Sequence, residues 1–480
     1  MEPRSKRLGE DEFLKQREEV LAQWATGRGV DLEEAIAYHK SLPAHKNFVN
    51  KLRYAKEHGE IYATTGMGKA TIEEQIELLK YVEKEGQADI LAISVDSLTR
   101  QNDYEGAQRG ISGSLEKGRS VLNGLPVVNH GVGGIRRIVE AVNCPVQPRY
   151  GAADPRLSDE ILLAGGCSCT APDVFMSFWH QHSKVPFKTV VRTHQYVGRL
   201  MGYYEEQGVP ISIGAQGLYG AGVPPSLQSA TVILSLLIQA EQGVKNMHVH
   251  CIGHGNLVQD VANANTRRKL LEEYLDKLEY HDIEIFLNAS FNLMQYPTEH
   301  GASFAVVFIN TLMAKLFGAQ LNDIRTVAEA KTIPTKEDLA YTFRTAKVMQ
   351  NLLKTQKIEF DRKEIDIEAQ MAEQEVRCIV DKVLELGDGD VVVGAEEAIE
   401  VGILDHPFAA NRAGLGKVMG VKDSEGAIRY LDPGNLPFTR EIVDFHRGKI
   451  AAREKVRGKK IDYETVLSDL LSISRGCLVE

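Results

Sequence analysis

Short apolar runs alternate with longer amphipathic stretches through the middle of the chain, from about residue 58 to residue 335. Runs such as residues 90–95 and 283–287 have the length and composition of buried strands. Each is followed by a polar or Gly-rich turn and then by apolar residues at helical spacing. Strands that alternate with helices in this way indicate parallel βαβ units.

Nine segments in this region qualify as strands, one more than an eight-stranded barrel needs. Two of them, residues 167–170 and 321–325, are shorter or less apolar than the others. The fold class predicted is α/β, and the length of the region favours a (β/α)8 barrel of the TIM type. A doubly wound sheet is the alternative, but Gly66-Met67-Gly68 lacks the third glycine of a dinucleotide fingerprint. The other candidate strands are residues 61–64, 90–95, 126–129, 146–147, 211–213, 247–250 and 283–287.

Helical patterns precede and follow the alternating region. Residues 1–57 predict an N-terminal helical arm, residues 58–335 the barrel, and residues 336–480 a C-terminal helical or α+β domain. In the last part, long charged helices are expected at 336–354 and 363–386, a short strand at 391–393, and closing helices at 438–455 and 462–473.

Composition narrows the class of protein. The 480 residues are 43% hydrophobic and 25% charged, which is typical of a globular protein. A net charge of −10 argues against nucleic acid or an anionic membrane as a partner. No apolar stretch approaches the roughly 20 residues of a membrane span, and the N-terminus lacks the apolar core of a signal peptide. Six cysteines in a chain of this length do not suggest a disulfide framework, so we expect a cytoplasmic protein.

Two arginines follow predicted strands directly. Arg100 comes after the run at residues 89–95, and Arg149 comes after Val146-Gln147. In parallel α/β folds the carboxyl end of the strands is where ligands bind. A guanidinium group matches a carboxylate with two parallel hydrogen bonds, so both arginines are candidates to bind an acidic substrate. The alternative is that each forms a structural salt bridge at the barrel mouth.

Histidines and cysteines raise the possibility of a metal site. His248 and His250 alternate on a predicted strand and therefore face the same side, with Cys251 and His254 close by. A metal-dependent barrel hydrolase is one interpretation; polar lining of the barrel mouth is the other. A second group, Cys167, Cys169, His180 and His182, has poor spacing for a structural zinc site.

Several longer stretches, in order along nearly the whole chain, carry a family resemblance. The chain resembles the large (E, or epsilon) subunit of glutamate mutase, also called methylaspartate mutase. The stretches include Thr99-Arg100-Gln101-Asn102, Leu122-Asn123-Gly124, Gly202-Tyr203-Tyr204-Glu205-Glu206-Gln207-Gly208-Val209, Val223-Pro224-Pro225-Ser226 and Asn435-Leu436-Pro437-Phe438-Thr439.

The resemblance implies an adenosylcobalamin-dependent isomerase that rearranges a carbon skeleton by radical hydrogen abstraction. It also implies a small cobalamin-binding (S, or sigma) subunit that carries an Asp-x-His-x-x-Gly motif, which this chain lacks. Two copies of each chain would form a heterotetramer around a homodimer of this chain. The cofactor contacts implied are Gly68, Asn123, His180, Tyr296, Arg325, Glu329 and Ile333.

The substrate residues implied by the family are only partly present. Arg100 and Arg149 match two of three substrate-binding arginines, but the third position is Gly66. The family's substrate glutamate aligns with Ala171. Two tyrosines align with Ser177 and Gln181, and Tyr150 replaces a histidine beside Arg149.

Loss of these groups predicts a related mutase whose carboxylic acid substrate has shifted from glutamate or 3-methylaspartate. Asp173, His180 or His182 could replace some of the missing polar contacts. Three interpretations remain in view: a carbon-skeleton mutase subunit, a metal-dependent barrel hydrolase, and a non-catalytic relative of the mutase subunit.

Overall fold

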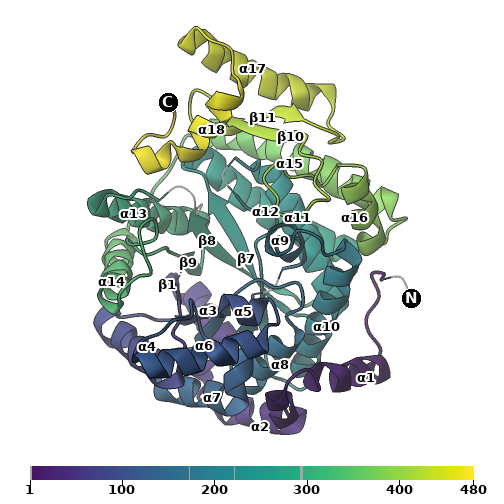
Figure 1. Ribbon diagram of the computed structural model, residues 1–480. Helices are drawn as coiled ribbons and strands as arrows, with labels where there is room; N and C mark the ends of the chain where they lie inside the picture. Colours follow the sequence, from purple (N-terminus) through teal and green to yellow (C-terminus); the bar gives the residue numbers. More distant parts are fainter. Residues whose placement is uncertain (1–2, 172, 221, 292–295) are drawn as a thin grey trace.

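Parallel strands form a curled wall at the centre of the molecule, with helices around its outside (Figure 1). The computed structural model describes residues 3–171, 173–220, 222–291 and 296–480. A six-stranded sheet has the order β1-β9-β8-β7-β6-β5, and a three-stranded sheet has the order β2-β3-β4. The strands are β1 (Tyr62–Thr64), β2 (Gly66–Met67), β3 (Leu91–Ser94), β4 (Val146–Arg149), β5 (Cys169–Thr170), β6 (Ser212–Ala215), β7 (Asn246–Gly253), β8 (Glu284–Phe291) and β9 (Leu321–Asp323).

The two sheets are continuous in the chain, because Thr65 alone separates β1 from β2. Every pairing within these two sheets is parallel, for example Thr64 with Asp323 and Ser94 with Arg149. No ladder joins the described residues of β4 and β5. The predicted α/β class is therefore confirmed, whereas the wall is seen as two curled parallel sheets rather than as one closed ring of eight strands.

Amphipathic helices follow the strands, and many begin at a side chain that caps the first turn. Thr71 accepts a backbone hydrogen bond at the start of α4, Asp103 does so for α6 and Asn256 for α12. The helices of this region are α4 (Ile72–Gly86), α5 (Ser97–Arg100), α6 (Tyr104–Lys117), α7 (Val127–Ala141), α8 (Arg156–Ala164), α9 (Val174–Met176), α10 (Phe187–Glu206), α11 (Pro225–Glu241), α12 (Leu257–Lys277) and α13 (His300–Phe317).

The strand predicted at residues 126–129 is wrong, because these residues open α7. Proline lacks the N–H that a central strand must donate, and only one isolated bridge, Val95 with Leu125, forms beside it. The first turn of α7 then ends at Gly131, whose φ of 64° breaks the helix before it resumes. This removes the surplus among the nine strand candidates.

The N-terminal arm closes the base of the strand wall. Phe48, Val49 and Leu52 on α3 pack with residues near the amino ends of the strands, among them Ile90 and Phe286. The backbone N–H of Phe48 also donates to Ser168 Oγ at 2.7 Å. The arm contains α1 (Glu10–Leu21), α2 (Leu32–Ser41) and α3 (Phe48–His58), with short 3₁₀ turns at Ala25–Gly29 and Ala44–Lys46.

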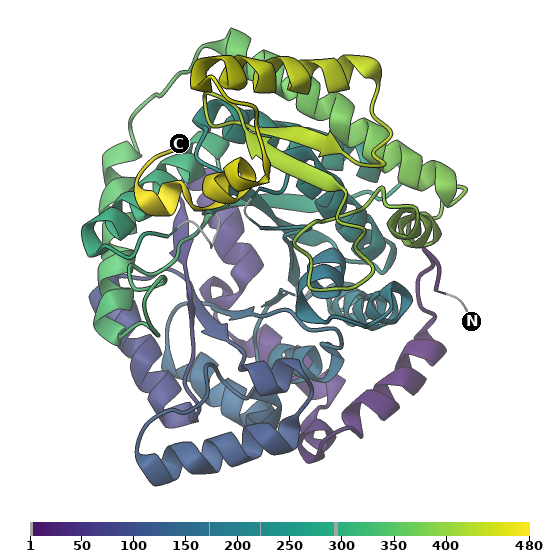
Figure 2. The same ribbon diagram turned by 45° about the horizontal axis from the view of Figure 1, so that its top comes forward.

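The C-terminal part packs against the outer helices α11 and α12 (Figure 2). A hairpin of β10 (Val418–Lys422) and β11 (Ile428–Pro433), which the sequence pattern did not predict, forms its centre. Residues 391–393 are helical rather than extended: Asp390 caps them by accepting hydrogen bonds from the backbones of Val392 and Val393. The helices are α14 (Lys336–Leu353), α15 (Arg362–Leu386), α16 (Val391–Glu400), α17 (Arg440–Arg457) and α18 (Tyr463–Leu471), followed by a 3₁₀ turn at Ile473–Arg475.

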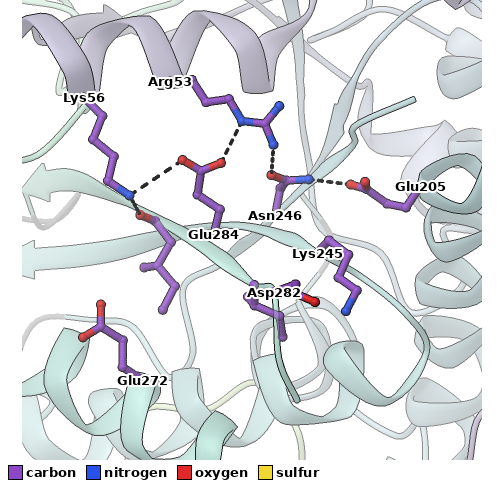
Figure 3. Close-up of a pocket in the computed structure, with 10 residues that line it drawn as sticks. Arg53, Lys56, Glu205, Lys245, Asn246, Glu272, Asp282 and Glu284 are labelled. Atoms are coloured by element: carbon purple, nitrogen blue, oxygen red, sulfur yellow. Dashed lines mark hydrogen bonds and ion pairs between the residues drawn. The ribbon is translucent and has the colours of Figure 1, made fainter. Parts of the chain in front are cut away.

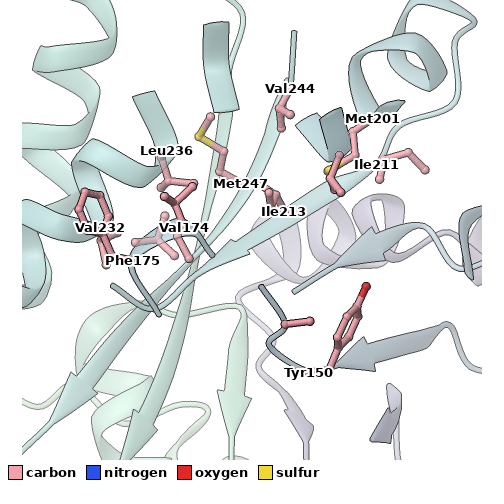
Figure 4. Close-up of a cluster of buried hydrophobic side chains, with 14 of the residues drawn as sticks. Tyr150, Val174, Phe175, Met201, Ile211, Ile213, Val232, Leu236, Val244 and Met247 are labelled. Atoms are coloured by element: carbon pink, nitrogen blue, oxygen red, sulfur yellow. The ribbon is translucent and has the colours of Figure 1, made fainter. Parts of the chain in front are cut away.

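The main hydrophobic core lies between the strands and these helices (Figure 4). Met247 and Ile213 on the sheet face Val232 and Leu236 of α11. Residues 225–240 of α11 are all buried, because α15 covers the side of the helix that faces away from the sheet. A helix that is apolar on all sides is expected only where two layers enclose it.

Among the described residues, α13 is the one helix long and apolar enough to span a membrane by length and composition. It packs on β8, β9 and α14, as the outer helix of a βα unit does.

Candidate functional site

A buried ion pair spans the space at the carboxyl ends of the strands. Arg149, at the end of β4, donates from both Nη atoms to the two carboxylate oxygens of Asp323 at 2.5 and 2.6 Å. Burial alone would raise the pKa of Asp323, but Arg149 and Arg325 outweigh it and hold this pKa below its usual range. The guanidinium fork predicted to bind a substrate carboxylate is thus filled by a carboxylate of the chain itself.

Gly66 on β2 leaves the path of Arg149 open. A Cβ atom built at position 66 would lie 2.5 Å from Ser94 Oγ and 3.8 Å from Cδ and Nε of Arg149. The distance to Ser94 is too short for a Cβ atom, whereas the distance to Arg149 is an ordinary van der Waals contact.

Arg100 lies in the last turn of α5, directly after β3. The buried carboxylate of Asp96 caps this short helix by accepting two of its backbone N–H groups at 2.9 and 3.2 Å. The side chain of Asn123 accepts a third, from Ser97, at 2.9 Å. Nε of Arg100 is buried and has no hydrogen-bond partner among the described residues. The helix is therefore fixed while its arginine retains a donor without an acceptor.

Arg325 acts on the same groups as each of these two arginines. We call Arg100, Arg149 and Arg325 together the arginine region. Arg325 acts on Asp323 together with Arg149, and it acts on Tyr219 together with Arg100. Burial raises the pKa of Tyr219, and the two arginines oppose that rise. Tyr219 was not predicted as a site residue; it follows β6 in a Gly-rich loop, which was the one available clue. The region suits an anionic ligand.

Two of the further predicted cofactor contacts, Tyr296 and Glu329, interact with Arg325. The hydroxyl of Tyr296 accepts a hydrogen bond from the backbone N–H of Arg325 at 3.3 Å. Burial would lower the pKa of Arg325, but Asp323 and Glu329 raise it above its usual value. Glu329 is exposed, and Ile333 is 70% exposed, so both are open to a ligand or a partner surface.

Gly68 lies against the backbone of the loop that holds Asn123. A Cβ atom at position 68 would come within 2.6 Å of Gly124 Cα and 2.8 Å of the carbonyl oxygen of Ser94. This contact brings the end of β2 and the loop before α7 together, and it leaves backbone rather than side chains at that point of the rim.

Tyr150 donates to Asp159 of α8 at 2.5 Å, and Thr170 Oγ1 donates to the same oxygen at 2.6 Å. Burial raises the pKa of Asp159 from its usual 3.8 to about 7, although both hydrogen bonds oppose the rise. The folded state therefore keeps this proton at pH values where the unfolded state has lost it. As a result, Asp159 makes the free energy of unfolding fall as the pH rises from about 4 to about 7.

Ser177 and Gln181 lie on a turn of π-helix, Ser177–Gln181, after α9. Ser177 is fully buried, and its Oγ lies 3.0 Å from His194 Nε2. Gln181 Nε2 contacts Met176 Sδ at 3.6 Å. His180, on the same turn, packs against the ring of Tyr219 with centroids 4.3 Å apart, so it borders the arginine region. Burial lowers the pKa of His180 to about 3, which keeps it neutral.

Asp173 is committed to the backbone, because its Oδ2 accepts from the N–H groups of Gln216 and Gly217 at 2.8 and 2.9 Å. Ala171, two residues earlier, and His182 are both half-buried. Asp173 thus joins the loops after β5 and β6 rather than offering a free acceptor.

The cover loop, residues 405–418 of the C-terminal part, closes over this π-helical turn. Its backbone N–H groups at Ala410 and Asn411 donate to the carbonyl oxygen of Trp179 at 2.9 and 3.2 Å. The carboxylate of Asp405 organises the loop by accepting five backbone N–H groups, from residues 406, 415, 416, 417 and 418, at 2.6 to 3.3 Å. The ring of His406 packs on His180, with centroids 5.3 Å apart.

His248 and His250 face the same side of β7, as the alternation predicted, but their ring nitrogens have partners in the fold. His248 Nδ1 lies 2.9 Å from Ser212 Oγ, and His250 Nε2 lies 3.1 Å from Asn288 Nδ2. Burial lowers the pKa of His254 to about 3, and its ring has no partner among the described residues. Cys167 and Cys169 pack into two different hydrophobic clusters. Over the described part of the chain, no group of His, Cys, Asp and Glu is placed to ligate a metal ion.

A charged cleft of about 290 Å³ lies at the opposite, amino end of β7 and β8 (Figure 3). Arg53 donates to Glu284 at 2.7 Å and to Asn246 at 3.2 Å, and Asn246 donates to Glu205 at 2.5 Å. These groups satisfy one another, so the cleft does not compete with the arginine region as a candidate site.

The fold is that of an α/β protein built from parallel βα units. Its arginines lie at the carboxyl ends of the strands, which is where proteins of this class bind their ligands. The family model of the methylaspartate mutase E chain (MutE) matches residues 42–480. The chain belongs to this family. The predicted family membership and the isomerase class are thereby confirmed, while the individual site residues remain predictions.

Relatives match over their full lengths, and each is named glutamate mutase epsilon subunit. The protein of Desulfitobacterium hafniense is 42% identical over 98% of this chain and 97% of its own. That of Treponema denticola is 39% identical over 99% and 98%, and that of Escherichia coli O157:H7 is 35% identical over 100% and 99%. Among solved structures, an N-acetylneuraminic acid synthetase of Leptospira borgpetersenii covers 64% of this chain and 90% of its own, at 9% identity and a TM-score of 0.31. That score is too low to support an argument.

Proposed function

We propose that this chain is the large catalytic subunit of an adenosylcobalamin-dependent carbon-skeleton mutase of the glutamate mutase type. The observation that carries the proposal is the full-length likeness to proteins named glutamate mutase epsilon subunit. The three arginines at one end of the strand wall support an acidic substrate. We further propose that the two curled sheets form one (β/α)8 barrel at residues 58–335, with residues 1–57 as the arm and residues 336–480 as the C-terminal domain.

The rim of the wall fits a large cofactor in two respects. The close contact between Gly68 and Gly124 presents backbone where a side chain would stand in the way. Exposed Glu329 offers acceptor oxygens suited to sugar hydroxyls, and exposed Ile333 offers apolar surface. Adenosylcobalamin supplies the radical chemistry when bound. The contacts proposed are Gly68, Asn123, His180, Tyr296, Arg325, Glu329 and Ile333.

The residues of this chain bind, orient and shield the substrate. Arg100 donates hydrogen bonds to its carboxylate, and α5 holds that arginine in place through Asp96. The cover loop excludes water on the side of His180 through its hydrogen bonds to the π-helical turn. Exclusion of water protects reactive species from side reactions.

We propose that the substrate is an acid other than glutamate, because Gly66, Ala171, Ser177 and Gln181 supply none of the charged or phenolic groups that the family pattern implies. The partner proposed is a small cobalamin-binding subunit with an Asp-x-His-x-x-Gly motif, in a cytoplasmic heterotetramer.

Reconstitution tests this proposal. The full chain is mixed with a small subunit of that type and adenosylcobalamin, and the complex is isolated by size-exclusion chromatography. We expect corrinoid absorbance to elute with both chains only when the small subunit is present. Turnover is then measured with glutamate, 3-methylaspartate and a panel of other carboxylic acids. Failure to take up the corrinoid would refute the function, and normal turnover of glutamate would refute the shifted substrate.

A further inference from the structure

The ion pair between Arg149 and Asp323 occupies a guanidinium fork that could otherwise bind a ligand carboxylate. We propose that Asp323 is a specificity-determining residue: by occupying the fork of Arg149, it restricts the site to substrates that present one carboxylate, bound at Arg100. This inference rests on the proposed function only in assuming that the arginine region is the substrate site.

The fork formed by the two Nη atoms of Arg149 is filled by Asp323. Nη1 donates to Oδ1 and Nη2 donates to Oδ2, which is the two-bond match between a guanidinium group and a carboxylate. A second carboxylate at this fork would have to displace Asp323. The buried Asp323 would then lose its hydrogen-bonded partner and keep only the charge of Arg325, an unfavourable state.

Gly66 lies beside this pair. The pair joins β4 to β9, and a Cβ atom at position 66 would lie 3.8 Å from Cδ and Nε of Arg149, an ordinary contact. Position 66 therefore places no charged side chain of its own next to the pair.

The described side chains next to Asp323 do not provide a second cation that could bind a carboxylate in place of Arg149. His250 Nδ1 lies 3.9 Å from Asp323, yet burial keeps this histidine neutral by lowering its pKa to about 3. Thr64 of β1 donates a hydrogen bond to Gln147 of β4 at 2.7 Å. Arg100 differs from Arg149, because its buried Nε lacks an acceptor among the described residues. A ligand carboxylate supplies that acceptor.

Two five-carbon probes separate the possibilities, because pentanoate carries one carboxylate and glutarate carries two. Their dissociation constants are measured by ligand-observed NMR titration of the purified full chain. We expect the wild type to bind both within about threefold of each other, since the second carboxylate finds no free fork. Asp323→Asn releases Arg149 and should strengthen glutarate binding by about tenfold or more, with pentanoate changed less than about twofold.

Two further variants interpret the result. Arg100→Gln should weaken both probes by about tenfold or more, because it removes the shared charge-assisted contact. Asp469→Asn is the matched control: Asp469 pairs with Arg453 through the same two-bond geometry, at 2.6 and 2.7 Å, in the C-terminal part. This control should leave the ratio of the two dissociation constants unchanged.

The wild-type ratio tests the proposal even if Asp323→Asn does not fold. Binding of glutarate at least tenfold tighter than pentanoate, or no binding of either probe, would overturn it. So would a folded Asp323→Asn variant with an unchanged ratio. None of these titrations requires the corrinoid or turnover, so failure of the proposed function would appear in the reconstitution and not here.

Discussion

The cover loop offers a direct test of how the C-terminal part reaches the site. Replacing Asp405 with alanine removes the acceptor of five backbone N–H groups at once. Residues 415–417 are exposed, so water can replace the carboxylate there, whereas residues 406 and 418 are buried. Hydrogen bonds to a charged group contribute about 1.5–3 kcal/mol each, so the two buried losses together should cost about 3–6 kcal/mol.

This cost should appear as local opening rather than global unfolding, because residues 405–417 lie between α16 and β10 and belong to neither. Hydrogen–deuterium exchange followed by mass spectrometry should show exchange in residues 406–418 faster by roughly two to four orders of magnitude. Residues 177–185 should follow, since the loop binds Trp179 and the side chain of Asn411 donates to Phe178 and Val185.

A conservative variant and a control make the test specific. Asp405→Asn keeps one acceptor oxygen and should produce about half of the free-energy change. Asp432→Asn alters an exposed aspartate in the same part of the chain, which accepts one backbone N–H at 2.9 Å. It should leave exchange in the cover loop unchanged. Unaltered protection of residues 406–418 in Asp405→Ala would refute the role assigned to this carboxylate.

Three further predictions concern buried groups. Asp159→Asn removes a carboxyl group whose pKa is about 7. The free energy of unfolding, measured by urea titration, should therefore fall between pH 5 and 8 by about 3 kcal/mol less in the variant than in the wild type. An equal fall in both proteins would contradict this. Gly68→Ala places Cβ 2.6 Å from Gly124 Cα and should lower the free energy of unfolding by about 1–3 kcal/mol, whereas an unchanged urea midpoint would disprove the contact. Arg453→Met leaves Asp469 buried without its arginine and should lower the free energy of unfolding by about 3–5 kcal/mol in urea titrations. Adding D469L should restore much of this free energy, and no recovery would argue against the pair.

Local sequence patterns were sufficient for elements whose local and tertiary preferences agree. The runs at residues 90–95 and 283–287 are apolar, short and followed by turns, and they form β3 and β8. The runs at residues 126–129 and 391–393 look similar but are helical, because a proline and a capping aspartate act on them. The hairpin of β10 and β11 was not predicted, because its strands lie in a segment rich in turn residues.

In the site as well, some residues could be predicted from the sequence, whereas their contacts could not. Parallel topology placed Arg100 and Arg149 at the carboxyl ends of strands from sequence alone. The partner of Arg149 could not be predicted, since Asp323 is 174 positions away in the chain and only the curl of the sheet brings the two together. The contacts of Tyr150 with Asp159, and of Asp405 with its loop, depend in the same way on how segments pack.

Helix α3 covers the amino end of the strand wall, because Phe48 and Leu52 pack against residues near the start of the strands. The three arginines lie at the other, carboxyl end of the wall. A protein that binds over the carboxyl end would therefore cover the arginines without displacing the N-terminal arm.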